Sequence, residues 1–222
     1  MALELGRDDE QRSTLTTTET ITANFPMIDQ NHGIERAIPT PSEGHSTGLE
    51  IISVTDQNGT ALTFSTDRSN STEVVRVGDK DTYVQGYKTY VLKYKQHDVT
   101  RYYADTNKDE FYWDLNGTQW KVPIRQFTAA ITLTPELARA YSQSSCYEGA
   151  QGATGSCSLT QEGEVFRVAT TELPAGENVT IAFGFSPQTF AQDQASFWER
   201  LVSIGLGVML ASGIIGLGVV VW

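Results

Sequence analysis

Two cysteines, Cys146 and Cys157, stand at the two ends of the Gly-rich stretch CYEGAQGATGSC, and the chain has no others. Thiols this close in sequence can pair, bind a metal or serve as nucleophiles. No histidine lies near them to complete a metal site or to activate a thiolate. In an extracytoplasmic domain the spacing predicts a local disulfide, whereas in the cytosol the two thiols would stay reduced. We favour the disulfide.

The histidines and carboxylates show no catalytic spacing. The three histidines, His32, His45 and His97, are scattered along the chain. Asp98 follows His97, but neighbours on a strand point to opposite faces and do not form a base with its orienting carboxylate. No Gly-x-Ser-x-Gly elbow, phosphate loop or zinc-type His-Glu helix is present. We expect no enzyme and no cofactor. The alternative left open is a β-sandwich hydrolase whose dispersed carboxylates converge in space.

One polar run resembles part of a calcium loop. Asp105 to Asp109 places oxygen ligands at the first, third and fifth positions of such a loop. The sixth position is Glu110 instead of the glycine of the sharp turn, and the twelfth is Asn116 instead of a bidentate glutamate. A solvated polar loop explains the run better, so we expect no metal site.

An aromatic segment offers a binding surface. Tyr112, Trp113 and Trp120 lie close together in sequence and could form a stacking platform for carbohydrate. The competing interpretation is that strand alternation sends every second aromatic residue into a sandwich core. Asn116-Gly117 would then form a hairpin turn between two strands. The core interpretation is the stronger one, and carbohydrate binding is kept as the alternative.

The charge is acidic and confined to the part of the chain before Leu201. The chain has 27 Asp and Glu against 16 Lys and Arg, which gives a net charge of −11. Phosphate neutralisation requires clustered basic residues, so nucleic acid is excluded as an expected partner. Docking on an anionic membrane surface is disfavoured for the same reason.

The end of the chain has the composition of a membrane helix. Leu201 to Trp222 contains no charged residue, and about 20 apolar residues cross the hydrocarbon core of a bilayer. We therefore predict a transmembrane helix over residues 198–222, with the lipid bilayer as a partner. Ser203, Gly207 and Ala211 form a small-residue face that suits packing against other transmembrane helices of a longer chain.

The remaining residues have the pattern of an all-β domain. Short runs rich in Thr, Val, Ile and aromatic residues alternate with turn residues, as in β-sandwiches. Asn58-Gly59 is a hairpin signal, and Thr134-Pro135 suits the start of one helical turn. We predict an Ig-like or jelly-roll-type β-sandwich over residues 1–185, a linker over 186–197 and then the membrane helix.

Three segments together resemble a known family. They are His32 to Pro39 (HGIERAIP), Phe111 to Ile124 (FYWDLNGTQWKVPI) and Cys146 to Cys157. In this order they are similar to the bacterial predicted membrane proteins built on domain of unknown function 2207 (DUF2207). The resemblance implies an extracytoplasmic β domain behind a signal peptide, followed by transmembrane helices. It implies no activity.

Topology follows from the resemblance more than from the flanking charges. Met1 to Arg7 has neither a basic nor an apolar signal region. We expect the chain to be a fragment of a longer membrane protein of the bacterial cell membrane, with its domain outside. We further expect a structural or protein-interaction role.

Overall fold

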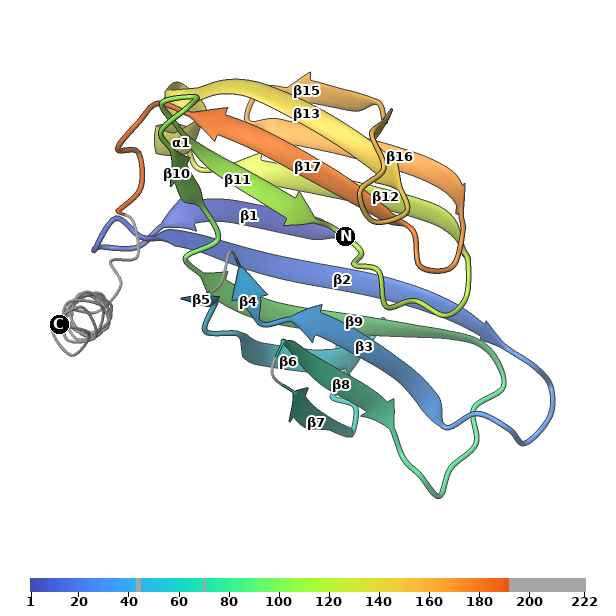
Figure 1. Cartoon of the computed structure of the whole chain (residues 1–222). Helices are drawn as coiled ribbons and strands as arrows, with labels where there is room; N and C mark the ends of the chain where they lie inside the picture. Colours follow the sequence, from blue (N-terminus) through green and yellow to red (C-terminus); the bar gives the residue numbers. More distant parts are fainter. Residues whose placement is uncertain (43–44, 70, 192–222) are drawn as a thin grey trace, which may run out of the picture. The chain divides into compact units, whose positions relative to one another are not determined.

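The computed structural model describes residues 1–42, 45–69 and 71–191 (Figure 1). This part of the chain consists of β-strands and one short helix, so the prediction of an all-β domain is confirmed. The strands are β1 (Ala2–Arg7), β2 (Ser13–Phe25), β3 (Gly33–Pro39), β4 (Pro41–Ser42), β5 (His45–Ser46), β6 (Glu50–Asp56), β7 (Phe64–Ser69), β8 (Thr72–Gly78), β9 (Gly86–His97), β10 (Arg101–Tyr103), β11 (Lys108–Asp114), β12 (Ile124–Leu133), β13 (Tyr141–Gly149), β14 (Gly155–Ser156), β15 (Leu159–Glu162), β16 (Val165–Leu173) and β17 (Asn178–Phe185), and the helix is α1 (Pro135–Ala140).

The largest sheet, called the central sheet below, has seven strands in the order β15-β16-β12-β1-β2-β9-β6. All neighbours in it are antiparallel except β1 and β12, which run parallel with Leu5 opposite Leu133. The first strand of the chain therefore lies inside the sheet, between a strand from the first half of the sequence and one from the second.

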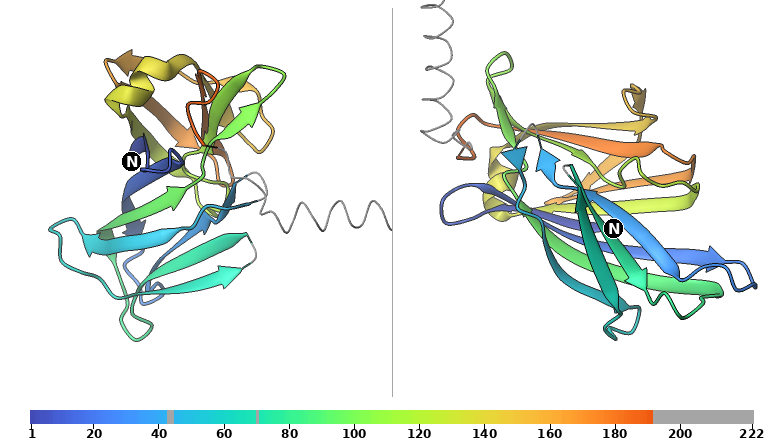
Figure 2. Two further views of the ribbon diagram at one scale, coloured as in Figure 1. Left: turned by 90° about the vertical axis from the view of Figure 1, so that its left-hand side faces the viewer. Right: turned by 60° about the horizontal axis from the view of Figure 1, so that its bottom comes forward.

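Two smaller sheets pack on one face of this central sheet (Figures 1 and 2). One has the order β10-β11-β17-β13-β14 and the other β3-β8-β7. Leu15 contributes to the core under the first and Phe25 to the core under the second. Both are odd-numbered residues of β2, and residues two apart on a strand share a face. Instead of the single predicted sandwich, one wide sheet is thus covered by two narrow ones.

Each small sheet encloses its own apolar core. The larger core is aromatic, with Phe111, Phe166, Phe183 and Phe185 all fully buried. The smaller core is mainly aliphatic and is built from β2, β3, β6, β8 and β9. The outward positions of β2 carry threonines, which suit a strand that is apolar on one face and solvated on the other.

Local sequence signals predicted two turns correctly, but the hairpin predicted at Asn116-Gly117 is wrong. The helical turn begins at Pro135, directly after Thr134, whose side chain makes no capping bond. Asn58-Gly59 lies in a tight turn with Gly59 at φ +84°. Asn116-Gly117 does not join a hairpin, because β11 pairs with β10 and β17 whereas β12 belongs to the central sheet.

The β domain extends beyond residue 185. Ser186 donates its backbone N–H to the carbonyl oxygen of Ala140, and Ala191 donates to that of Gln11. Phe190 is buried in the larger core. The first six residues of the predicted linker, 186–191, therefore pack on the domain, and the compact unit spans Met1–Ala191.

The predicted membrane helix, 198–222, lies outside the described residues. Its proposed packing face, Ser203, Gly207 and Ala211, lies there too. Within residues 1–42, 45–69 and 71–191, no helix is long and apolar enough to cross a membrane.

Candidate functional site

A groove with a volume of about 920 Å³ opens along β2. Residues 19–26 form one wall, and Trp120 together with residues 122–128, which include the start of β12, forms much of the other. Ile34 of β3 and Tyr87 of β9 also contribute to the lining. The groove therefore joins parts of the molecule that belong to both cores.

β1, over Ala2–Arg7, lies between β2 and β12 along only part of their length. β1 pairs with β2 only as far as Thr18, and with β12 only from Ala130 onward. Beyond these two positions, β2 pairs with β9 alone and β12 pairs with β16 alone. The groove runs between β2 and β12 in this region.

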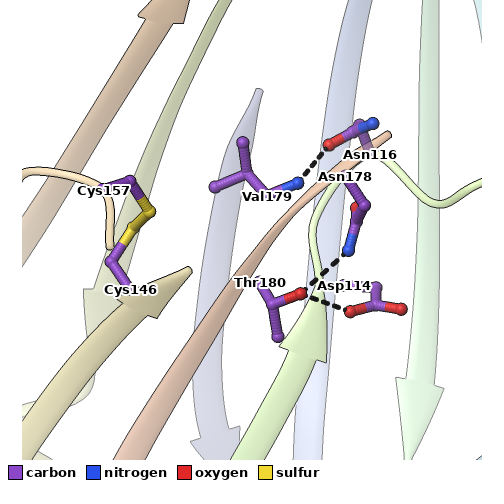
Figure 3. The surroundings of a disulfide bond; sticks show 7 residues. All are labelled: Asp114, Asn116, Cys146, Cys157, Asn178, Val179 and Thr180. Atoms are coloured by element: carbon purple, nitrogen blue, oxygen red, sulfur yellow. Dashed lines mark hydrogen bonds between the residues drawn. A yellow bond between two sulfur atoms is a disulfide. The ribbon is translucent and has the colours of Figure 1, made fainter. Parts of the chain in front are cut away.

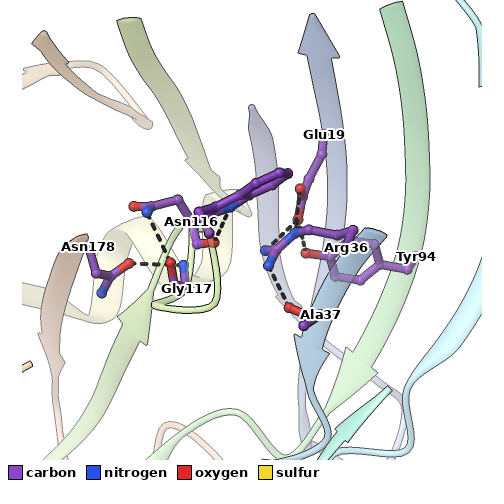
Figure 4. Close-up of polar contacts among 8 residues, drawn as sticks. Glu19, Arg36, Ala37, Tyr94, Asn116, Gly117 and Asn178 are labelled. Atoms are coloured by element: carbon purple, nitrogen blue, oxygen red, sulfur yellow. Dashed lines mark hydrogen bonds and ion pairs between the residues drawn. The ribbon is translucent and has the colours of Figure 1, made fainter. Parts of the chain in front are cut away.

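A buried ion pair lies at the inner side of this groove (Figure 4). The Glu19 carboxylate, on β2, accepts two hydrogen bonds of 2.8 Å from Nε and Nη2 of Arg36 on β3. It also accepts a bond of 2.6 Å from the hydroxyl of Tyr94 on β9. All three residues are at most 3% exposed. The carboxylate is neutralised and hydrogen-bonded, as a buried charge requires.

The surroundings of Tyr94 and Arg36 shift the pKa values of both side chains. Burial raises the pKa of the Tyr94 hydroxyl well above its ordinary value, and the adjacent Glu19 charge raises it further. Burial alone would lower the pKa of Arg36, but the Glu19 carboxylate outweighs it and the pKa is raised. Arg36 therefore stays charged and the Tyr94 phenol stays neutral throughout the physiological range.

The Arg36 guanidinium is covered by the loop that follows β11. Its central carbon lies 5.8 Å from the ring centroid of Trp120, within the range of a cation–π contact. The Trp120 indole N–H donates to the carbonyl oxygen of Asn116 at 3.0 Å. Gly117 has φ +71°, and an added Cβ there would lie 3.3 Å from Nη1 of Arg36. The loop thus needs glycine where it approaches the cation.

Two buried asparagines hold this loop against β17 (Figures 3 and 4). The Asn116 side chain donates to the carbonyl oxygen of Glu177 and accepts from the backbone N–H of Val179, each at 2.9 Å. The Asn178 side chain accepts from the backbone N–H of Gly117 at 3.0 Å. An Asn-Gly pair that resembles a hairpin turn in the sequence therefore serves as a bridge between the loop after β11 and β17, the neighbour of β11 in the same sheet.

The aromatic residues predicted as a carbohydrate platform lie in three environments. Tyr112 points away from the core and is 54% exposed. Trp113, on the opposite face of β11, stacks on buried Phe111 with ring centroids 5.6 Å apart. Trp120 covers Arg36. The structure does not gather the three on one surface, and Tyr112 is the most accessible of them.

The two cysteines form a disulfide, as the sequence predicts (Figure 3). Cys146 is buried on β13, and its carbonyl oxygen accepts from the backbone N–H of Cys157 at 3.1 Å. Pairing of β13 with β14 brings the chain back to this point. In the part of the chain described by the structure, no three His, Cys, Asp or Glu side chains gather as a metal site would need.

The sequence carried a signal for the buried pair that its analysis missed. Glu19 shares the inward phase of β2 with Leu15, and Arg36 shares the phase of Ile38 on β3. A charged residue at an inward position of each of two strands indicates that the two charges meet. Their long-range pairing is visible only in the structure.

Comparison with known proteins gave a family match and distant structural neighbours. Residues 10–185 match the family model described as "Predicted membrane protein (DUF2207) N-terminal domain". No curated protein matches the chain. Among solved structures, native leukotriene A4 hydrolase from Saccharomyces cerevisiae is 14% identical, with a TM-score of 0.49, over 82% of this chain and 28% of that one. A putative protease from Parabacteroides distasonis is 12% identical, with a TM-score of 0.43, over 82% and 39%. The M1 zinc metallopeptidase from Deinococcus radiodurans is 11% identical, with a TM-score of 0.36, over 82% and 40%. The chain thus spans well under half the length of these proteins.

Proposed function

Since the chain belongs to the DUF2207 family of predicted membrane proteins, we propose that its β domain is a non-catalytic interaction module. In this proposal the domain stands on the outer side of a bacterial cell membrane, anchored through residues 198–222. The observation that carries the non-catalytic role is that Glu19, the buried carboxylate in the lining of the groove beside β2, is already taken by Arg36 and Tyr94.

A hydrolase would use the groove differently. General acid–base catalysis needs a carboxyl group free to exchange a proton near neutral pH. Glu19 is locked in a bidentate pair with Arg36, and the other charged side chain in the lining is that of Arg125, which cannot act as a base.

The disulfide supports the outward orientation. Disulfides persist in oxidising compartments and are rare in the reducing cytosol. The Cys146–Cys157 bridge joins a buried cysteine of β13 to the segment before β15, so it is part of the packed domain. The apolar segment Leu201 to Trp222 supports the anchoring.

Orientation is tested with a protease site in the full-length protein. A recognition sequence for a site-specific protease, inserted at the exposed turn Asn58-Gly59, should be cut when the protease is added to intact cells. The same recognition sequence inserted after Trp222 tests on which side of the membrane that position lies. Cleavage at the turn only after the membrane is permeabilised would contradict the outward orientation.

The non-catalytic role is tested separately. Purified full chain incubated with peptide mixtures and cell-wall glycan fragments should return them unchanged by mass spectrometry. Turnover that disappears in a folded Glu19→Gln variant would overturn this part of the proposal.

A further inference from the structure

The five-stranded sheet β10-β11-β17-β13-β14 has an outer face that carries two tyrosines and a carboxylate. Its inner face contributes Phe111 of β11 and Phe183 of β17 to the larger core. Successive side chains of a strand point to opposite faces, so Tyr112 and Asp114 of β11 lie on the outer face. Both are exposed, and Tyr147 of β13 is half-buried.

The strand register brings these three side chains together. Asp114 lies opposite Thr180 of β17, and Thr180 lies opposite Tyr147, so they form one row across the sheet. Tyr112 belongs to the next row, opposite Ala182. Neighbouring strands are about 4.8 Å apart, and residues two apart on a strand are separated by about 6.8 Å. The two tyrosines therefore stand on either side of β17, with the small side chains of Thr180 and Ala182 between them.

A chain of hydrogen bonds orients the Asp114 carboxylate on this face (Figure 3). The side-chain amide of Asn178 donates to the Thr180 hydroxyl at 3.0 Å, and that hydroxyl donates to Oδ1 of Asp114 at 2.7 Å. Among the residues that the structure describes, no donor bonds to the second oxygen, Oδ2, and no cation pairs with this carboxylate. One carboxylate oxygen is thus fixed by the protein and the other faces solvent.

The two phenols and the carboxylate are close enough to influence one another. Burial raises the pKa of Tyr112, and the Asp114 charge and Tyr147 raise it further. The positions beside them on β17 and β13 carry uncharged side chains, namely Thr180, Ala182 and Ser145. The negative charge of Asp114 is therefore not compensated locally, and it lies beside two aromatic rings, whose faces also attract cations.

An exposed carboxylate between aromatic rings is complementary to a cation, because the ring faces and the carboxylate attract the same charge. We propose that Tyr112, Asp114 and Tyr147 form a binding site for the ammonium group of a lysine side chain on a partner polypeptide. This inference rests on the proposed interaction role and names the chemistry that the partner presents. The ammonium pairs with Oδ2 of Asp114, and the methylene stem lies along the rings.

The hydrogen bonding of Asp114 favours lysine over arginine. A guanidinium binds a carboxylate best through two parallel N–H···O bonds, which use both oxygens. Oδ1 of Asp114 already accepts from Thr180, so a guanidinium would have to compete with that hydroxyl. The compact ammonium of lysine needs Oδ2 alone.

The spacing of the two tyrosines favours an unbranched stem. They stand on β11 and β13, which are about 10 Å apart across β17. One methylene chain fits between two rings at that spacing, in contact with each at about 3.5–4.0 Å. The ring of an amino sugar is wider, so this spacing favours a lysine side chain over a glycan amine.

The probe is Nα-acetyl-lysine methylamide, titrated into the purified full chain in detergent. The chain carries 3-fluorotyrosine in place of tyrosine and is followed by fluorine NMR, with ionic strength held constant by sodium chloride. The signals of Tyr112 and Tyr147 are assigned by their loss in Tyr112→Phe and Tyr147→Phe. We expect both signals to shift saturably at probe concentrations up to about 10 mM, and the other tyrosine signals to stay in place.

A change in the probe tests the charge without altering the protein. The Nε-acetylated form of the same probe keeps the stem but is neutral, so it should bind roughly tenfold more weakly or worse. Nα-acetyl-arginine methylamide and glucosamine should also bind more weakly than the lysine probe.

A change in the protein tests the residue. Asp114→Asn keeps an acceptor for the Thr180 hydroxyl and removes the charge, so it should weaken binding roughly tenfold or more. Glu4→Gln is the matched control, because it neutralises an exposed carboxylate whose neighbours across the ladder are Thr16 and Thr132. This control should bind the probe as the unaltered chain does.

The outcomes separate this inference from the proposed function. No saturable shift, equal binding of the Nε-acetylated probe, or unchanged binding by folded Asp114→Asn would overturn the ammonium site. Tighter binding of the arginine probe or of glucosamine would overturn the assignment to lysine. Each of these results would leave the interaction role to another surface. Conversely, a failed protease-access test would remove the outward orientation without affecting the titration in detergent.

Discussion

The buried pair of Glu19 and Arg36 leads to the sharpest prediction about stability. Glu19→Gln keeps the size of the side chain but removes its charge, which leaves the Arg36 cation buried without a counter-charge. Both side chains are at most 4% exposed, so solvent cannot replace the lost partner. Breaking a buried pair in this way costs about 3–5 kcal/mol of unfolding free energy.

A double variant of the same pair tests whether the unpaired buried charge causes this loss of stability. Replacing both residues with apolar ones, Glu19→Leu with Arg36→Met, removes both desolvation penalties and should cost much less than the single change. Glu35, the residue next to Arg36, provides a matched control because it forms an exposed ion pair. Its carboxylate lies 2.7 Å from the Arg76 guanidinium, and the Arg76 and Glu35 side chains are 46% and 61% exposed. Glu35→Gln should leave stability unchanged within error.

Urea unfolding of the full chain, followed by tryptophan fluorescence and far-ultraviolet circular dichroism, measures these differences. With a slope of about 2–3 kcal/mol per molar urea, Glu19→Gln should lower the midpoint by roughly 1–2.5 M. Equal midpoints for Glu19→Gln and Glu35→Gln would refute the reasoning, because burial would then not matter. A double variant as unstable as the single one would refute it too.

Three further predictions concern pH, the disulfide and the loop over the cation. The pKa of Tyr94 is raised in the folded state. Its contribution to the unfolding free energy is therefore present below its unfolded pKa of about 10 and is lost as pH rises through the folded value. Tyr94→Phe should make the unfolding free energy fall less steeply at alkaline pH, and an unchanged pH dependence would contradict this. Replacing Cys146 and Cys157 together by alanine should cost about 2–4 kcal/mol, seen as a lower urea midpoint equal to that of the reduced unaltered chain. Gly117→Ala should destabilise more than Gly59→Ala, since both have positive φ but only Gly117 lies close to a neighbouring side chain; equal thermal midpoints for the two variants would show that the close contact is unimportant.

The sequence predicted the local features of this domain because they depend on neighbouring residues. Short runs rich in Thr, Val, Ile and aromatic residues identify strands such as β2. The helical turn at Pro135 and the turn at Gly59 follow from the conformational limits of proline and glycine.

Pairings between distant strands could not be predicted in the same way. Nothing local shows that Leu5 lies opposite Leu133, or that β12 leaves β11 for another sheet. The groove was missed for that reason, since its walls come from β2 and β12, which are far apart in sequence. The hairpin prediction at Asn116-Gly117 was wrong because the same dipeptide can form a turn or bridge two segments through its side chain. The segment that packs against it, here the start of β17, decides between the two.

The parallel pairing of β1 with β12 also sets the order in which the domain can assemble. All elements of the smaller core lie between β2 and β9, so that core can form once the chain has been synthesised as far as His97. The larger core needs strands as late as β17, and β1 acquires its second neighbour only when Leu133 has emerged. Domains form from the N-terminus during synthesis, and contacts between distant residues form slowly. The edge of β1 that faces β12 is therefore exposed throughout that interval, which leaves β1 prone to mispairing in the nascent chain.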